Sequence, residues 1–130
     1  MKDDPAILVV EDDKTVCAFL HLLLDALGFT NVTMTWMAEY AAELAMARRF
    51  DLIISDHYLP NMTGVELHRK LRTAGCQTPF LLISGADDSD FMQNITASGI
   101  RYFLPKPFDL DTFRHSVNLA LETAVLASTV

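Results

Sequence analysis

Hydrophobic and polar positions divide the chain into short apolar runs and longer amphipathic stretches that alternate. The first run, Ala6–Val10, is apolar throughout, which is typical of a central parallel strand covered on both faces. The next stretch, Lys14–Leu27, spaces apolar residues by three and four positions, which predicts a helix that Gly28 ends. The side chains predicted to point inward are Val16, Phe19, Leu20, Leu23, Leu24 and Leu27.

The same alternation continues to the end of the chain. Further strands are predicted at Asn31–Trp36, Asp51–Ser55, Pro79–Ser84 and Arg101–Leu104. Helices are predicted at Ala38–Arg48, Val65–Ala74 and Asp88–Ser98, with a last one that Asp109 or Asp111 can cap. The inner faces of the last three helices are expected to carry Leu67 and Leu71; Phe91, Met92 and Ile95; and Leu110, Phe113, Val117, Leu121 and Val125.

Five strand-then-helix units predict an α/β fold. Such a (βα)5 chain forms a doubly wound, parallel five-stranded sheet with helices on both faces and right-handed crossovers. The 130 residues, 51% of them hydrophobic, suit one domain spanning positions 1–130.

Charge and apolar run length exclude several classes of protein. The net charge of −7 disfavours direct nucleic-acid binding, and the basic segment His68–Arg72 is interpreted as the solvent face of a helix. No signal-peptide pattern and no apolar run of membrane-spanning length is present, so we expect a cytoplasmic protein without membrane insertion. Cys17 is interpreted as a buried free thiol, and His57 as a surface loop residue.

Charged residues follow three of the predicted strands. Glu11 and Asp12 come after the first strand, Asp56 follows the third, and Lys106 comes after the fifth. Ligands of such folds gather at the carboxyl ends of the strands, so these groups are expected at one edge. Each alone is more often an ordinary turn or surface residue. Together, in this order, they indicate a site for a divalent cation and a phosphoryl group.

These motifs resemble the receiver domain of bacterial response regulators, from about Ile7 to the last helix. The residues that carry the resemblance are Glu11, Asp12, Asp56, Pro60, Gly64, Ser84, Lys106 and Pro107. The resemblance implies a flavodoxin-like fold with strand order 2-1-3-4-5. It also implies that Asp56 is the phosphoacceptor, that Lys106 and Ser84 contact phosphoryl oxygens, and that the Lys106–Pro107 peptide bond is cis.

The resemblance further implies a Mg²⁺ cofactor, with Mn²⁺ able to replace it. Asp12, Asp56 and the backbone carbonyl of Tyr58 would bind the ion directly, and Glu11 through a water molecule. An alternative alignment takes Asp12 and Asp13 as the acidic pair, but Asp13 is better placed as a helix cap.

The partners implied are a sensor histidine kinase or histidine phosphotransfer protein, and a downstream protein on the face of the fourth helix, fifth strand and fifth helix. Ser84 and Phe103 would form the switch, although a plain core role suits Phe103 almost equally. Accepting and losing its own phosphoryl group would not make the chain a turnover enzyme.

Three other functions remain as alternatives. A magnesium-dependent phosphatase with an aspartyl nucleophile would need a second aspartate where Tyr58 stands. A flavodoxin-like cofactor carrier would need a phosphate-binding loop after the first strand. Glu11, Asp12 and Asp13 stand there instead, and without a cation they would repel a phosphate. A degenerate receiver serving only as a docking module would not need the full set of site residues.

Three residues depart from the commonest pattern of the family. Gly85 follows Ser84 where alanine is usual, and Tyr58 is bulky beside the acceptor; both could change the lifetime of the phosphoryl group. Pro105 removes a backbone donor, which bears on the hydrogen bonding of the last strand.

Overall fold

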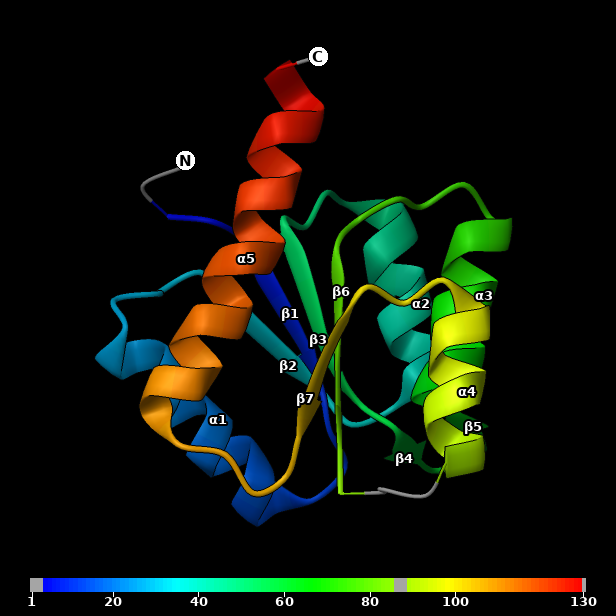
Figure 1. The fold of residues 1–130 in the computed structure, drawn as a ribbon. Helices are drawn as coiled ribbons and strands as arrows, with labels where there is room; N and C mark the ends of the chain where they lie inside the picture. Colours follow the sequence, from blue (N-terminus) through cyan, green and yellow to red (C-terminus); the bar gives the residue numbers. More distant parts are fainter. Residues whose placement is uncertain (1–3, 86–88, 130) are drawn as a thin grey trace.

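The computed structural model describes residues 4–85 and 89–129 and shows a parallel sheet between two layers of helices (Figure 1). The strands of this sheet are β1 (Ile7–Val10), β2 (Val32–Thr35), β3 (Leu52–Asp56), β6 (Phe80–Ser84) and β7 (Tyr102–Pro105). They lie in the order β2-β1-β3-β6-β7, and every neighbouring pair is parallel. Numbered among themselves, these strands have the order 2-1-3-4-5, so the predicted doubly wound fold is confirmed.

The helices form one layer on each face of the sheet. One layer consists of α1 (Lys14–Ala26) and α5 (Leu110–Thr129), and the other of α2 (Ala38–Ala47), α3 (Gly64–Thr73) and α4 (Ser89–Ser98) (Figure 1). Among the described residues, no helix is both long enough and apolar enough to cross a membrane.

Successive strand residues supply the two halves of the core, because side chains along a strand point to opposite faces. In β1, Ile7 and Val9 pack with α1 and α5, whereas Leu8 and Val10 pack with α2, α3 and α4. Both faces of β1 are therefore buried, which explains why its sequence is apolar throughout.

Side-chain caps set the starts of α1 and α5. The Asp13 carboxylate accepts the backbone N–H groups of Thr15 at 2.8 Å and Val16 at 3.2 Å, so Asp13 caps α1. Of the two candidates for α5, Asp109 is the cap, because its carboxylate accepts the N–H of Thr112 at 2.8 Å.

Some details differ from the sequence predictions. The segment between Asp56 and Gly64 forms a small antiparallel hairpin, β4 (Tyr58–Leu59) and β5 (Met62–Thr63), with Asn61 at a φ of 68° in its turn. Its strands are too short to show an alternating pattern in sequence, which is why the hairpin was not predicted.

The burial of several residues also differs from the prediction. Phe19 is 44% exposed, although its ring lies 6.0 Å from that of Phe108, and Leu110 is exposed as well. Cys17 is half-buried, and His68, interpreted as solvent-facing, is buried. Asp88 and the side chains of Phe91, Met92 and Val125 lie outside the described residues.

Candidate functional site

The carboxyl ends of four strands bring the predicted site residues together. The register pairs Val10 with Ser55, so the segment after β1 begins beside the end of β3, where Asp56 stands. Ser84 ends β6 and pairs with Pro105 of β7, directly before Lys106. The N–H of Lys106 donates to the Ser84 carbonyl at 2.9 Å, so the ladder continues past Pro105 despite its missing donor.

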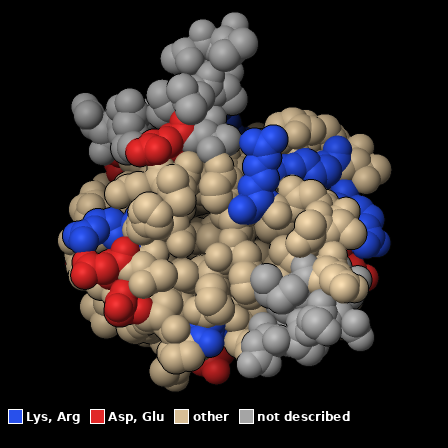
Figure 2. All heavy atoms as spheres, in the orientation of Figure 1, with Lys and Arg blue, Asp and Glu red and all other residues tan. Residues whose placement is uncertain are grey.

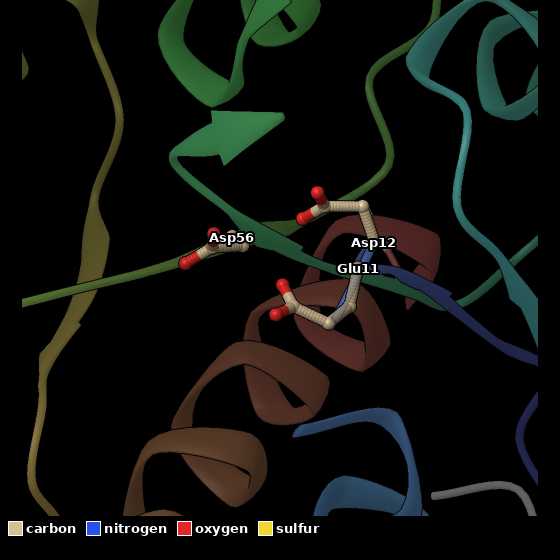
Figure 3. A group of neighbouring side chains, drawn as sticks. All are labelled: Glu11, Asp12 and Asp56. Carbon is tan, nitrogen blue, oxygen red and sulfur yellow. The ribbon is translucent and has the colours of Figure 1, made fainter. Parts of the chain in front are cut away.

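Three carboxyl groups meet at this edge (Figure 3). Ligand oxygens of Glu11, Asp12 and Asp56 all lie within 4.8 Å of one another. Asp12 is exposed, whereas the Asp56 side chain is 11% exposed and Glu11 is buried. The Glu11 backbone is fixed, because its N–H donates to the carbonyl of Thr35 at 2.9 Å.

The electrostatics of Glu11 show that this cluster suits a cation. Burial, and next the charge of Asp56, raise the pKa of Glu11 to about 8, while Lys106 acts in the opposite direction. Among the described residues, the Glu11 Oε2 atom is buried without a hydrogen-bond partner. A divalent ion would offset the repulsion between the carboxylates and supply the partner that the Glu11 Oε2 atom lacks. The donor set therefore fits Mg²⁺.

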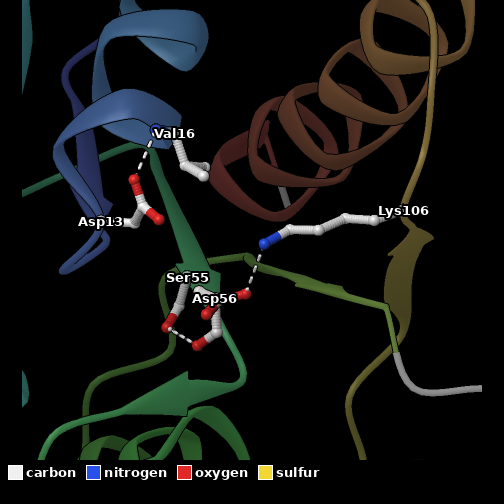
Figure 4. Close-up of polar contacts among 5 residues, drawn as sticks. All are labelled: Asp13, Val16, Ser55, Asp56 and Lys106. Carbon is white, nitrogen blue, oxygen red and sulfur yellow. Dashed lines mark hydrogen bonds and ion pairs between the residues drawn. The ribbon is translucent and has the colours of Figure 1, made fainter.

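Lys106 contacts the acidic cluster at Asp56. Its Nζ atom lies 3.0 Å from the Oδ1 atom of Asp56 (Figure 4). The lysine side chain is 31% exposed and the aspartate 11%, so the pair borders solvent and an incoming group can reach it. The Lys106–Pro107 peptide bond is cis, as the resemblance implied.

The remaining predicted residues surround this pair. Ser84 is fully buried at the end of β6, and a Cβ added at Gly85 would come no closer than 3.9 Å to Lys106. Tyr58 is 59% exposed in the hairpin next to Asp56. Phe103 is partly buried and packs on the side of the sheet that carries α2, α3 and α4.

Two neighbours of Asp56 have structural roles that the sequence prediction missed. His57 is 8% exposed and continues β3, since its N–H donates to the Ile83 carbonyl at 3.0 Å; its prediction as a surface loop residue was wrong. The Ser55 hydroxyl donates to the Asp56 carbonyl at 2.8 Å (Figure 4). Alternation carried beyond Ser55 would have placed His57 inside the fold.

Gly64 allows the close approach of α3 to the acceptor strand. A Cβ at this position would lie 2.7 Å from the Asp56 carbonyl oxygen and 2.5 Å from Leu82 Cδ1. The sequence marked Gly64 only by its distance from Asp56; the structure supplies the physical reason for glycine.

Comparisons with known proteins agree with this geometry. A family model described as the response regulator receiver domain matches residues 7–118. The cell cycle transcriptional regulator CtrA of Caulobacter vibrioides is 34% identical over 105 residues, which cover 81% of this chain and 45% of CtrA. The chain thus spans less than half the length of that relative.

Solved structures show the same fold. The chemotaxis protein CheY4 of Vibrio cholerae superposes with a TM-score of 0.82 at 28% identity, over 91% of this chain and 99% of that one. The receiver domain of the Francisella response regulator 1452 gives 0.84 at 27% identity, over 92% and 98%. With the family match over residues 7–118, these likenesses show that the chain belongs to the receiver domains of two-component response regulators.

Proposed function

We propose that Asp56 accepts a phosphoryl group from a phosphohistidine of a sensor histidine kinase or a histidine phosphotransfer protein. The observation that carries this proposal is the placement of Asp56, with Lys106 at 3.0 Å on one side and two further carboxyl groups within 4.8 Å on the other. A carboxylate can attack phosphorus and form an acyl phosphate, provided that the negative charge of the donor is neutralised.

We assign that neutralisation to Mg²⁺ and Lys106. Asp12, Asp56 and the Tyr58 carbonyl would bind the ion, with Glu11 acting through a water molecule, and Mn²⁺ would serve as a substitute. The ion supplies charge compensation for the phosphoryl oxygens. This chain's own residues do the rest: Asp56 supplies the nucleophilic oxygen, while Lys106 and the Ser84 hydroxyl each hold a phosphoryl oxygen.

The phosphorylated domain would act as a switch rather than as a turnover enzyme. Phosphorylation adds charge at one end of the sheet, and a two-state element must respond to it. We assign the response to Ser84 and Phe103, which lie on adjacent strands, and the partner-binding face to α4, β7 and α5. In this proposal residues 1–130 form one cytoplasmic receiver domain, and its downstream partner is a protein rather than nucleic acid.

The test is phosphorylation by acetyl phosphate in the presence of Mg²⁺, followed by mass spectrometry of the intact protein. The parent should gain one phosphoryl group that is lost at alkaline pH, and Asp56→Asn should gain none. Asp111→Asn, which removes an exposed carboxylate on α5, is the matched control and should be labelled like the parent. Equal labelling of Asp56→Asn would refute the assignment, and an unlabelled parent would favour a docking module.

A further inference from the structure

A cavity lies at the end of the sheet opposite Asp56. It has a volume of about 340 Å³ and is bordered by the last turns of α3 and the starts of β6 and β7. Its polar and aromatic lining consists of His68, Arg72, Gln77, Phe80, Arg101 and Tyr102. The volume falls within the range of small-molecule sites, roughly 300–1,000 Å³.

His68 is the buried polar group of this cavity. The residue is 3% exposed, and its ring meets the ring of Phe80 edge-on with centroids 5.2 Å apart. Among the described residues, neither ring nitrogen of His68 has a hydrogen-bond partner. Because one of the two nitrogens of a neutral imidazole always carries a proton, His68 holds an unused donor that is buried directly beside the cavity.

Two arginines bring positive charge to the same cavity. Burial is the main cause that lowers the pKa of the Arg72 guanidinium, and the nearby positive charge of Arg101 lowers this pKa further. The Arg72 Nη1 atom donates to the Cys76 carbonyl at 2.9 Å, which fixes the side chain in place. Within the described part of the chain, no carboxylate pairs with either arginine, and none lines the cavity.

The basic groups on this face stand out against the acidic chain. Lys and Arg side chains gather over the region of α3 and the start of β7, on a molecule whose net charge is −7 (Figure 2). Two like charges held together raise the free energy of the folded state, and an anion between them would lower it. Guanidinium groups suit oxygen anions in particular, because their forked N–H groups match carboxylate and phosphate geometry.

We propose that this cavity binds a small molecule through a phosphate or carboxylate group, held by Arg101 and Arg72, while the buried His68 ring turns so that its N–H reaches the anion. The site is separate from the phosphorylation site. The four residue steps of β6 between Phe80, which lines the cavity, and Ser84 span about 13 Å. Binding here therefore requires neither Mg²⁺ nor Asp56.

The experiment titrates metal-free protein with inorganic phosphate and, separately, with acetate, at constant ionic strength kept with chloride. Amide NMR should show one saturating curve shared by Gly99, Tyr102 and the side-chain amide of Gln77. The two titrations decide whether phosphate or carboxylate is the preferred group. Phosphate held instead at Lys106 would move the amides of Asp56 and Gly85.

Two variants of lining residues test the site, and one variant outside the cavity is the control. Arg101→Gln, at an exposed position, should weaken the binding at least tenfold, whereas Arg49→Gln removes an equal charge from an exposed position outside the cavity and should leave it unchanged. His68→Phe should weaken binding while keeping the fold, since it replaces one buried ring with another. Equal affinity in the parent and Arg101→Gln, no saturable shift with either anion, or shifts only around Asp56 would overturn the proposal.

Discussion

At the scale of single residues, the three neighbouring carboxyl groups in the loop between β1 and α1 have different roles. Glu11 is buried under the site, Asp12 is exposed within the acidic cluster, and Asp13 faces the first turn of α1. Their spacing in sequence does not reveal which of them meets Asp56. The cap geometry decides it, because the Asp13 carboxylate already accepts the N–H groups of Thr15 and Val16.

Exchanging these residues for alanine should separate metal binding from stability. Asp12→Ala should weaken Mg²⁺ binding by at least about tenfold, since even indirect ligands commonly contribute that much. Asp13→Ala should leave Mg²⁺ affinity nearly unchanged but lower the free energy of unfolding by about 1 kcal/mol through loss of the cap. Calorimetric Mg²⁺ titration and urea unfolding measure the two effects. Equal losses of Mg²⁺ affinity in both variants would shift the acidic pair by one residue.

His68 makes a pH-dependent contribution to stability. Burial, and next the charge of Arg72, lower its pKa from 6.5 to about 4. Between these two values the unfolded chain binds more protons than the folded protein, so stability should fall as the pH falls through this window. The loss is on the order of 3 kcal/mol when complete.

The comparison of parent and His68→Phe isolates this contribution from the titration of the carboxylates. Urea unfolding at several pH values between about 4 and 6.5, in buffers free of phosphate and carboxylate, should show a flatter profile for the variant. His115→Gln, at an exposed position of α5, is the control and should keep the parent's profile. Parallel profiles for the parent and His68→Phe would show that His68 does not titrate in this way.

At the scale of elements, the start of α3 is held against the sheet without room for a side chain. Gly64→Ala would place a Cβ 2.7 Å from the Asp56 carbonyl oxygen, and this neighbour is backbone that cannot turn aside. We expect a loss of about 1–3 kcal/mol in the free energy of unfolding, as for other overpacked positions. Gly85→Ala is the matched control, because the nearest atom to its added Cβ lies 3.9 Å away. Equal urea midpoints for both variants would refute the close-approach argument.

The strands and helices could be predicted because their patterns are long and repeat in a fixed order. The near-continuous apolar runs of β1 and β6 indicate strands buried on both faces. The parallel register then brings the carboxyl ends of these strands to one edge. The β4–β5 hairpin escaped because two-residue strands carry no periodicity. The burial of His68 was not predicted either, since that residue is covered only when elements distant in sequence pack over it.

At the scale of the whole molecule, the sheet connects two chemically different ends. Its carboxyl-terminal edge holds the acidic cluster and Lys106, whereas its amino-terminal edge holds the basic cavity of His68, Arg72 and Arg101. The acidic edge could be anticipated from sequence, because its residues stand at or just after the ends of recognisable strands. The basic cavity could not, because α3 and the α4–β7 connection meet only in the folded protein.

Between these ends, β7 would connect the proposed phosphorylation site to the proposed partner face of α4, β7 and α5. Phe103 precedes Lys106 by three residues, pairs with Leu82 of β6, and packs on the side that α4 covers. Lys106 should therefore sense the phosphoryl group, and Phe103 should pass the response to α4. A plain core role would give Phe103 the same partial burial, so only a perturbation can separate the two roles.

Beryllofluoride, which mimics the phosphoryl group, permits that comparison without turnover. Lys106→Ala should abolish the activated amide shifts of α4, read at residues 95–98. Phe103→Ala should keep phosphorylation of Asp56 within about twofold of the parent, because Phe103 packs against the core on the side of α2, α3 and α4, while the α4 shifts shrink. Its loss of core volume would lower stability by about 3 kcal/mol or less at a half-buried site, and Phe103→Leu, which keeps most of that volume, controls for packing alone. If Phe103→Ala reaches the same activated spectrum as the parent, Phe103 is a core residue, and the signal reaches α4 through Ser84 and β6.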